Sequence, residues 1–192
     1  MTVSENVKKN SLFEIFSSLK KSQLFWILSF TVLTFLSAQV EIPTNPVPFT
    51  LQTMLVILAG AFLGSKNGAL SLIIYLTIGA IGLPVFAGFG FGFAKILGPT
   101  GGYLISFPFA AFLVGYIIEK RRTNISVFLA FFAGLLLILL AGASYLSIFM
   151  NGDLSKSLFA GALIFSVWDL IKCFAAFSIY KSISKKYPKL PG

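Results

Sequence analysis

Asp169 and Lys172 stand out among the residues able to do chemistry, because both carry charge inside an otherwise apolar run. At a rise of about 1.5 Å per residue, Asp169 lies roughly 18 Å into that run, too deep to reach either membrane surface. Three residues apart, the two side chains share one helical face. They are therefore either a structural ion pair or a polar wall for a bound solute. Trp168 beside them either stacks on a ligand or faces lipid.

A second candidate region spans residues 83–103, where glycine alternates with phenylalanine ahead of a Gly-Pro-Thr-Gly-Gly turn. This stretch is too irregular to face lipid, where each unpaired backbone polar group costs roughly several kcal/mol. It predicts either an outer loop that closes over a pocket or a plain surface connector. Lys95 is its only cation, and it either attracts an anionic group or is simply solvated.

A third candidate region, Pro-Val-Pro-Phe-Thr-Leu-Gln-Thr at residues 46–53, places Thr50, Gln52 and Thr53 at the start of an apolar run. The first N–H groups of a helix lack partners within it, so such an end accepts polar ligand groups well. Ordinary helix capping would explain the same residues.

The composition excludes an ordinary soluble domain. The 192 residues are 57% hydrophobic and only 11% charged, against about 25% charge in soluble domains. With no histidine and a single cysteine, Cys173, the chain has no internal disulfide, no zinc site built from cysteine and histidine, and no histidine-based catalytic dyad. The composition predicts a polytopic membrane protein and excludes most hydrolase chemistry. We expect a chain that is not itself an enzyme and that holds no metal or cofactor.

Six apolar runs, separated by proline, glycine or charge, predict an all-α membrane protein with six transmembrane helices. The first two runs cover residues 23–40 and 49–64, and a turn at residues 65–68 leads into a third that ends near residue 84. The last three cover residues 102–118, 125–150 and 157–180. We expect a single membrane domain, with a cytoplasmic segment at 1–22, the bundle at 23–180 and a cytoplasmic tail at 181–192.

The distribution of positive charge predicts the topology, because cytoplasmic loops collect lysine and arginine. With six helices, one side receives Lys8, Lys9, Lys20, Lys21, Lys66, Lys120, Arg121, Arg122, Lys181, Lys185, Lys186 and Lys189. The other side receives only Lys95 and Lys156. Both termini are therefore expected in the cytoplasm of a cell-membrane protein, and the net charge of +9 reflects topology, not nucleic-acid binding.

The N-terminal part allows two further readings. The first apolar run is either a transmembrane helix or the core of a cleaved signal peptide, although it exceeds the roughly 7–15 residues typical of such cores. Before it, Leu12, Phe13, Ile15, Phe16 and Leu19 form a weak amphipathic pattern that fits a helix lying along the inner membrane surface.

Four motifs resemble one family, the BioY proteins, which are substrate-binding (S) subunits of energy-coupling-factor vitamin transporters that recognise biotin. They are VPFTLQT at 47–53, GAIGLPVF at 79–86, LGPTGGYL at 97–104 and DLIK at 169–172. The resemblance implies high-affinity biotin capture in the membrane, together with a transmembrane coupling (T) subunit and ABC-type ATPases. The chain itself has no G-x-x-x-x-G-K-[ST] nucleotide-binding motif.

The resemblance also implies roles for individual residues. Asp169 would accept the ureido N–H groups, while Lys172 would either donate to the ureido carbonyl or hold Asp169 ionised. Lys95 would pair with the valerate carboxylate. The remaining candidate binding residues are Tyr103, Phe86, Thr50, Gln52, Gly98 and Thr100. The ureido end should dominate selectivity, because buried polar groups left unpaired by a wrong ligand are costly.

Two positions depart from the family pattern. Val167-Trp168 replaces the Pro-Gly that often precedes the aspartate, and Thr34-x-x-x-Ala38 replaces the Ala-x-x-x-Ala used for docking the T subunit. Other functions stay open: an S subunit for another small vitamin, a stand-alone biotin transporter, a structural membrane protein or a membrane enzyme. A membrane enzyme would need a catalytic histidine, a metal cluster or a second buried carboxylate.

Overall fold

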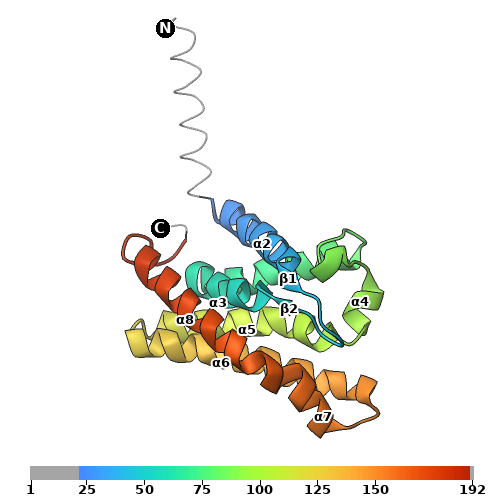
Figure 1. Cartoon of the computed structure of the whole chain (residues 1–192). Helices are drawn as coiled ribbons and strands as arrows, with labels where there is room; N and C mark the ends of the chain where they lie inside the picture. Colours follow the sequence, from blue (N-terminus) through green and yellow to red (C-terminus); the bar gives the residue numbers. More distant parts are fainter. Residues whose placement is uncertain (1–21, 191–192) are drawn as a thin grey trace, which may run out of the picture.

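The computed structural model describes residues 22–190, which form mainly helices (Figure 1). The helical elements are α2 (Gln23–Gln39), α3 (Gln52–Ala80), the 3-10 turn η1 (Ala87–Phe89), α4 (Phe93–Leu97), α5 (Gly101–Lys120), α6 (Asn124–Leu146), η2 (Ser147–Met150), α7 (Leu154–Leu158), the π-helical turn η3 (Phe159–Leu163) and α8 (Ile164–Ser184). The amphipathic segment expected before residue 21, and Lys8, Lys9, Lys20 and Lys21, lie outside the described residues.

Four helical runs in the described part of the chain are long and apolar enough to cross a membrane. They are Gln52–Ala80, Gly101–Lys120, Asn124–Met150 and Leu154–Ser184. A fifth apolar helix, α2, has 17 residues. The last three predicted runs match their helices within a few residues.

The second and third predicted runs both lie in α3, which folds back on itself at Gly64. Gly64 has a φ of +81° inside an otherwise helical stretch, a conformation that glycine adopts without strain. A Cβ atom at Gly68 would lie 2.8 Å from the Cα of Gly60, whereas eight residues of straight helix span about 12 Å. The expected turn at residues 65–68 is therefore misplaced, because the chain reverses at Gly64 and those residues are already helical.

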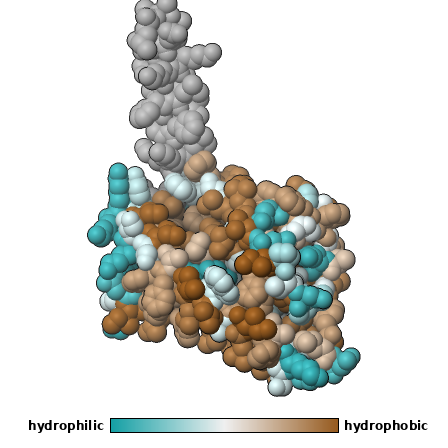
Figure 2. Space-filling model, in the orientation of Figure 1, coloured by the Kyte–Doolittle hydropathy of each residue, from teal (hydrophilic) through white to brown (hydrophobic). Residues whose placement is uncertain are grey.

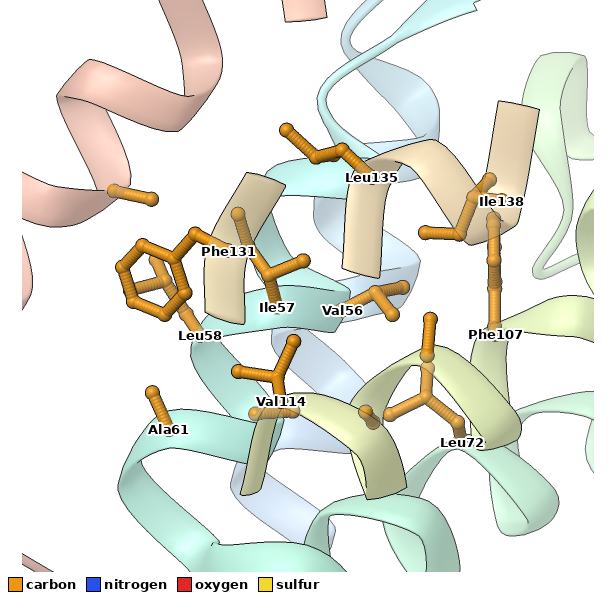
Figure 3. Close-up of a cluster of buried hydrophobic side chains, with 14 of the residues drawn as sticks. Val56, Ile57, Leu58, Ala61, Leu72, Phe107, Val114, Phe131, Leu135 and Ile138 are labelled. Atoms are coloured by element: carbon orange, nitrogen blue, oxygen red, sulfur yellow. The ribbon is translucent and has the colours of Figure 1, made fainter. Parts of the chain in front are cut away.

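Small residues let the helices pack closely. A side chain at Gly60 would collide with the Ala111 backbone of α5, and one at Gly115 would collide with the backbone at Ser65. The core between α3, α5 and α6 is apolar (Figure 3), and its labelled side chains are Val56, Ile57, Leu58, Ala61, Leu72, Phe107, Val114, Phe131, Leu135 and Ile138. Gly60 and Gly115 thus permit close packing of α3 against α5.

The connection between α2 and α3 contains a short hairpin that the all-α prediction missed. Strands β1 (Glu41–Ile42) and β2 (Phe49–Thr50) pair antiparallel, with Glu41 opposite Thr50 and Ile42 opposite Phe49. The hairpin holds the start of α3 against the end of α2. It was missed because two-residue strands leave no alternating pattern to detect.

Polar residues gather at opposite ends of the molecule. Figure 2 shows hydrophilic side chains at two ends of the visible face, with hydrophobic residues over most of the surface between them. The end of α8 and the start of α6 lie on one side of Figure 1, and α4 and α7 lie toward the other. The cations expected to cluster after α5 and α8 therefore share one end of the bundle.

The Thr34-x-x-x-Ala38 face of α2 points into the protein. Thr34 and Ala38 are fully buried, and on the same helix the Thr31 hydroxyl donates to the Ser71 carbonyl of α3 at 2.9 Å. The expected docking face is thus covered by the chain's own packing.

Candidate functional site

The Asp169–Lys172 pair is buried on α8. Lys172 Nζ lies 2.5 Å from Asp169 Oδ1, and the two residues are only 8% and 3% exposed. A charge taken this far from water is retained only with a close partner and further hydrogen bonds. The pair has both.

The start of α3 completes the coordination of this pair. Lys172 Nζ donates to the Thr53 hydroxyl at 2.8 Å and to the Thr50 carbonyl at 3.0 Å. The Thr53 hydroxyl donates in turn to Asp169 Oδ1 at 2.9 Å. The Lys172 ammonium, with three partners, thus joins the start of α3 to α8, more than 100 residues away in the sequence. The Thr53 side chain takes part in this network and does not cap its helix.

A cavity adjoins the pair, so the two side chains are not simply wedged between helices. It holds ≈ 560 Å³ of empty space, open solvent at its mouth included. Eight candidate binding residues line it: Thr50, Gln52, Phe86, Lys95, Thr100, Tyr103, Asp169 and Lys172. The candidate binding residues named from the sequence did not include further lining residues, namely Val47, Pro48, Thr53, Ala87, Leu104, Phe107, Leu139 and Phe165. Val47, Pro48 and Thr53 lie in the 46–53 region and Ala87 in the 83–103 region that the sequence singled out, whereas the other four look like ordinary core residues.

Aromatic side chains form one wall of the cavity. Phe165 stacks on Phe49 with ring centroids 4.1 Å apart. Tyr103 donates its hydroxyl to the Gly161 carbonyl in η3 at 2.7 Å, and its ring lies against Gly142, where any side chain would collide with it. The Tyr103 hydroxyl is therefore committed to the protein, and the ring supplies an apolar surface.

The loop after α3 covers the cavity and is held by a chain of hydrogen bonds. Gln52 Nε2 donates to the Tyr75 hydroxyl at 2.7 Å, which donates to the Val85 carbonyl at 2.9 Å. Next to Val85, the Phe86 ring is fully buried, stands edge-on to Tyr75, and fills the space above Gly79. Phe86 is thereby fixed as part of the cavity wall.

Lys95 lies between the cavity and a neighbouring surface groove of ≈ 730 Å³. The groove shares Pro48, Ala87, Lys95 and Thr100 with the cavity. Gly98, the remaining candidate residue, lines this groove and not the cavity. Glu41 also faces the groove, but none of the ion pairs between described residues includes Lys95.

Trp168 is not part of the cavity wall. It is 52% exposed on the outer side of α8, which favours lipid contact over ligand stacking. α8 runs without interruption through Val167 and Trp168, so the departure from Pro-Gly leaves Asp169 on a regular helix.

Comparison with known proteins decides the family. The model of the BioY family matches residues 8–189. The chain belongs to the BioY family. It is 44% identical over 158 residues to a probable biotin transporter BioY of Pyrococcus horikoshii, covering 82% of this chain and 93% of the relative. It is 39% identical over 156 residues to the biotin transporter BioY of Thermotoga maritima, covering 81% and 92%.

A solved structure shares the fold. It is the S-component for biotin from an ECF-type ABC transporter, which superposes with a TM-score of 0.81 at 30% identity and covers 97% of this chain and 95% of the other. The BioY family membership and this likeness therefore extend over nearly the whole chain.

Proposed function

We propose that this BioY protein is the biotin-binding S subunit of an ECF-type transporter. The observation that carries the proposal is a buried ion pair, hydrogen-bonded to Thr53 and to the Thr50 carbonyl, that forms one wall of a largely apolar cavity leading to Lys95. Biotin has the matching chemistry: a ureido ring, an apolar thioether ring and a carboxylate tail. The names of the relatives and of the structural neighbour support the same ligand.

The ureido ring is assigned to Asp169. Its Oδ1 is occupied by Lys172 and Thr53, while the described residues donate no hydrogen bond to its second carboxylate oxygen, which can accept a ureido N–H. The three N–H donors of an ammonium are already used on Asp169, Thr53 and Thr50. Of the two roles considered for Lys172, holding Asp169 ionised and oriented is therefore the one that the contacts favour.

The rest of biotin is assigned to the aromatic wall and the mouth of the cavity. The thioether ring would pack on Phe165 and Tyr103, and the valerate chain would run toward the groove so that its carboxylate meets Lys95. Glu41 on the groove's far part would disfavour a carboxylate that overshoots Lys95.

The topology follows from charge. We infer six membrane crossings, with the two halves of α3 counted separately, and both termini in the cytoplasm. The chain would form one membrane domain surrounded by lipid, with the cavity open to the outside. Energy would come from a T subunit and ABC-type ATPases, and the chain itself would catalyse no reaction.

Calorimetric titration of the purified full chain with biotin tests the proposal. Asp169→Asn is expected to weaken binding by about tenfold or more, because a site built to hydrogen-bond polar ligand groups discriminates strongly. Asp153→Asn, the same change at an exposed Asp-x-x-Lys pair, is the matched control and should leave the isotherm unchanged. Normal binding by Asp169→Asn would remove this residue from the site.

A second titration tests Lys95. Biotin amide lacks the carboxylate, so it should bind the unmodified protein more weakly than biotin does. In Lys95→Met the preference for biotin over its amide should disappear. If Lys95→Met still prefers biotin over its amide, the biotin carboxylate binds to another residue.

A further inference from the structure

A second groove lies at the basic end of the bundle, away from the biotin cavity and between the start of α6 and the end of α8 (Figure 1). It holds ≈ 480 Å³ of empty space, open solvent included, and is lined by Arg122, Asn124, Val127, Phe177, Tyr180, Lys181, Ser184 and Pro188. Among the described lining residues two are cations and none is acidic. Its charge and polar groups suit an anion.

Tyr180 supplies a hydroxyl donor. The residue is only 5% exposed, and its ring packs against Phe62 and Phe131. Its hydroxyl makes no hydrogen bond with any described residue, although it belongs to the groove lining. No buried side-chain polar atom of the described residues lacks a partner, so this hydroxyl reaches the accessible surface of the groove and is available to an occupant there.

The N-terminus of α6 adds unpaired backbone donors. Thr123 caps the helix by accepting a hydrogen bond from the Ser126 N–H at 3.2 Å. The N–H groups of Asn124 and Ile125 precede the first intrahelical bond and point out of this 23-residue helix. The start of a helix is also the positive end of its dipole, which favours anions.

The acidic residue Glu119, three residues before Arg122, is already compensated. It is bound by Lys189 at 2.8 Å and by the Ser65 hydroxyl at 2.7 Å. None of the ion pairs between described residues joins it to Arg122 or Lys181.

The surface that continues from the groove is apolar. On α6, Ile125 and Leu129 are 73% and 55% exposed, and on α8, Phe174 is 58% exposed. The groove therefore lies where exposed apolar helix faces meet the charged end of the bundle. A phosphate bound there would have acyl chains beside it if it belonged to a lipid, and a soluble anion would gain nothing from these faces.

We propose that this groove binds the phosphate group of an anionic membrane phospholipid. Arg122 and Lys181 supply charge, Tyr180 supplies a hydroxyl donor, and the start of α6 supplies backbone N–H groups. Basic pockets between transmembrane helices at the membrane surface bind anionic head groups by the same physics. The inference does not depend on which vitamin occupies the cavity.

Native mass spectrometry of the purified full chain, titrated with phosphatidylglycerol in detergent, tests this proposal. The double variant Arg122→Gln/Lys181→Gln should bind the lipid about tenfold more weakly, since each cation near a membrane surface contributes substantially to anionic-lipid attraction. The control Arg121→Gln/Lys185→Gln removes the same charge from exposed cations outside the groove. Its affinity for the lipid should fall far less. Tyr180→Phe should weaken binding without changing net charge.

Three results would overturn the proposal: equal losses in the two double variants, equal retention of phosphatidylcholine by the unmodified protein, or full competition by inorganic phosphate at the lipid's own concentration. The last result would identify a soluble phosphate as the occupant. Melting temperatures of all variants in lipid-free detergent should match, which separates lost binding from lost folding.

Discussion

Two Asp-x-x-Lys pairs of identical spacing lie in opposite environments, one at the start of the last helical run, where Asp153 caps Leu154–Ser184, and one within it. In the first, Asp153 and Lys156 approach to 3.1 Å with side chains 36% and 75% exposed. In the second, Asp169 and Lys172 approach to 2.5 Å with side chains 4% and 10% exposed. The same sequence pattern therefore gives a surface ion pair at one end and a buried one farther along.

The difference shows that the i,i+3 spacing brings the two charges together, whereas the surroundings determine whether the pair can bind a ligand. At the first pair, Asp153 begins α7 by accepting the Lys156 backbone N–H at 2.9 Å, and water screens the charges. At the second pair, water is replaced by Thr53, the Thr50 carbonyl and the cavity. Only the second pair presents a charge that a ligand can reach without competing with bulk water.

The largest expected effect comes from removing one partner of the buried pair. Lys172→Met should lower the free energy of unfolding by about 3–5 kcal/mol, because it leaves the Asp169 charge buried and unpaired. Lys156→Met should change it by less than about 1 kcal/mol. Denaturant unfolding in detergent, followed by circular dichroism, compares the two variants directly.

A double variant separates stability from binding at the same site. Asp169→Leu/Lys172→Met replaces both charges and should recover most of the lost stability, since apolar residues of similar volume often replace a buried pair without loss. Biotin binding should remain absent. Recovered binding would mean that the pair serves folding alone.

The next effect tests the cavity that distinguishes the two pairs. In Gly79→Leu the new side chain must displace the Phe86 ring, and overpacking of this kind typically costs about 1–3 kcal/mol. Biotin affinity should fall although no charge changes. Thr77→Leu, on the exposed side of the same helix, is the control, and unchanged affinity in Gly79→Leu would place biotin away from Phe86.

An effect of similar size is expected from the hydrogen bonds that hold the covering loop. Tyr75→Phe leaves the Gln52 amide and the Val85 carbonyl without their shared partner, a loss of about 1–3 kcal/mol for buried groups. Amide hydrogen exchange should accelerate around residues 85–90 and biotin should dissociate faster. If hydrogen exchange accelerates only in α3, the hydrogen bonds from Gln52 through Tyr75 to Val85 support the helix and not the loop.

The sequence predicted the buried pair but not the contacts that complete it. Charge inside an apolar run is visible in a single sequence, so Asp169 and Lys172 stood out at once. Their contact with Thr50 and Thr53 depends on how α3 packs beside α8, which no local pattern encodes. The reversal at Gly64 was misplaced for a similar reason: Ser65-Lys66-Asn67-Gly68 has the composition of a turn, yet one glycine conformation suffices to reverse the chain.

A third ion pair lies between the two extremes. Glu119 and Lys189 have side chains 32% and 44% exposed and join the end of α5 to the C-terminal segment. Glu119→Gln should therefore lower the free energy of unfolding by no more than about 1 kcal/mol, after allowance for solvent screening. Biotin titration should be unaffected. A loss comparable to that in Lys172→Met would mean that tertiary connection matters more than burial.

The smallest effect concerns Asp153 and is visible only through pH. Its pKa is lowered below the usual 3.8, chiefly because the Lys156 backbone N–H donates to the carboxylate and also because of the Lys156 side chain. A carboxyl whose pKa is lower in the folded state stabilises that state above its unfolded pKa, and this contribution is lost as pH falls through the folded value. The melting temperature of the unmodified protein should thus exceed that of Asp153→Asn near pH 6, and the gap should close below about pH 4. A gap that stays constant with pH would show that Asp153 acts by hydrogen bonding to the helix start and not through its charge.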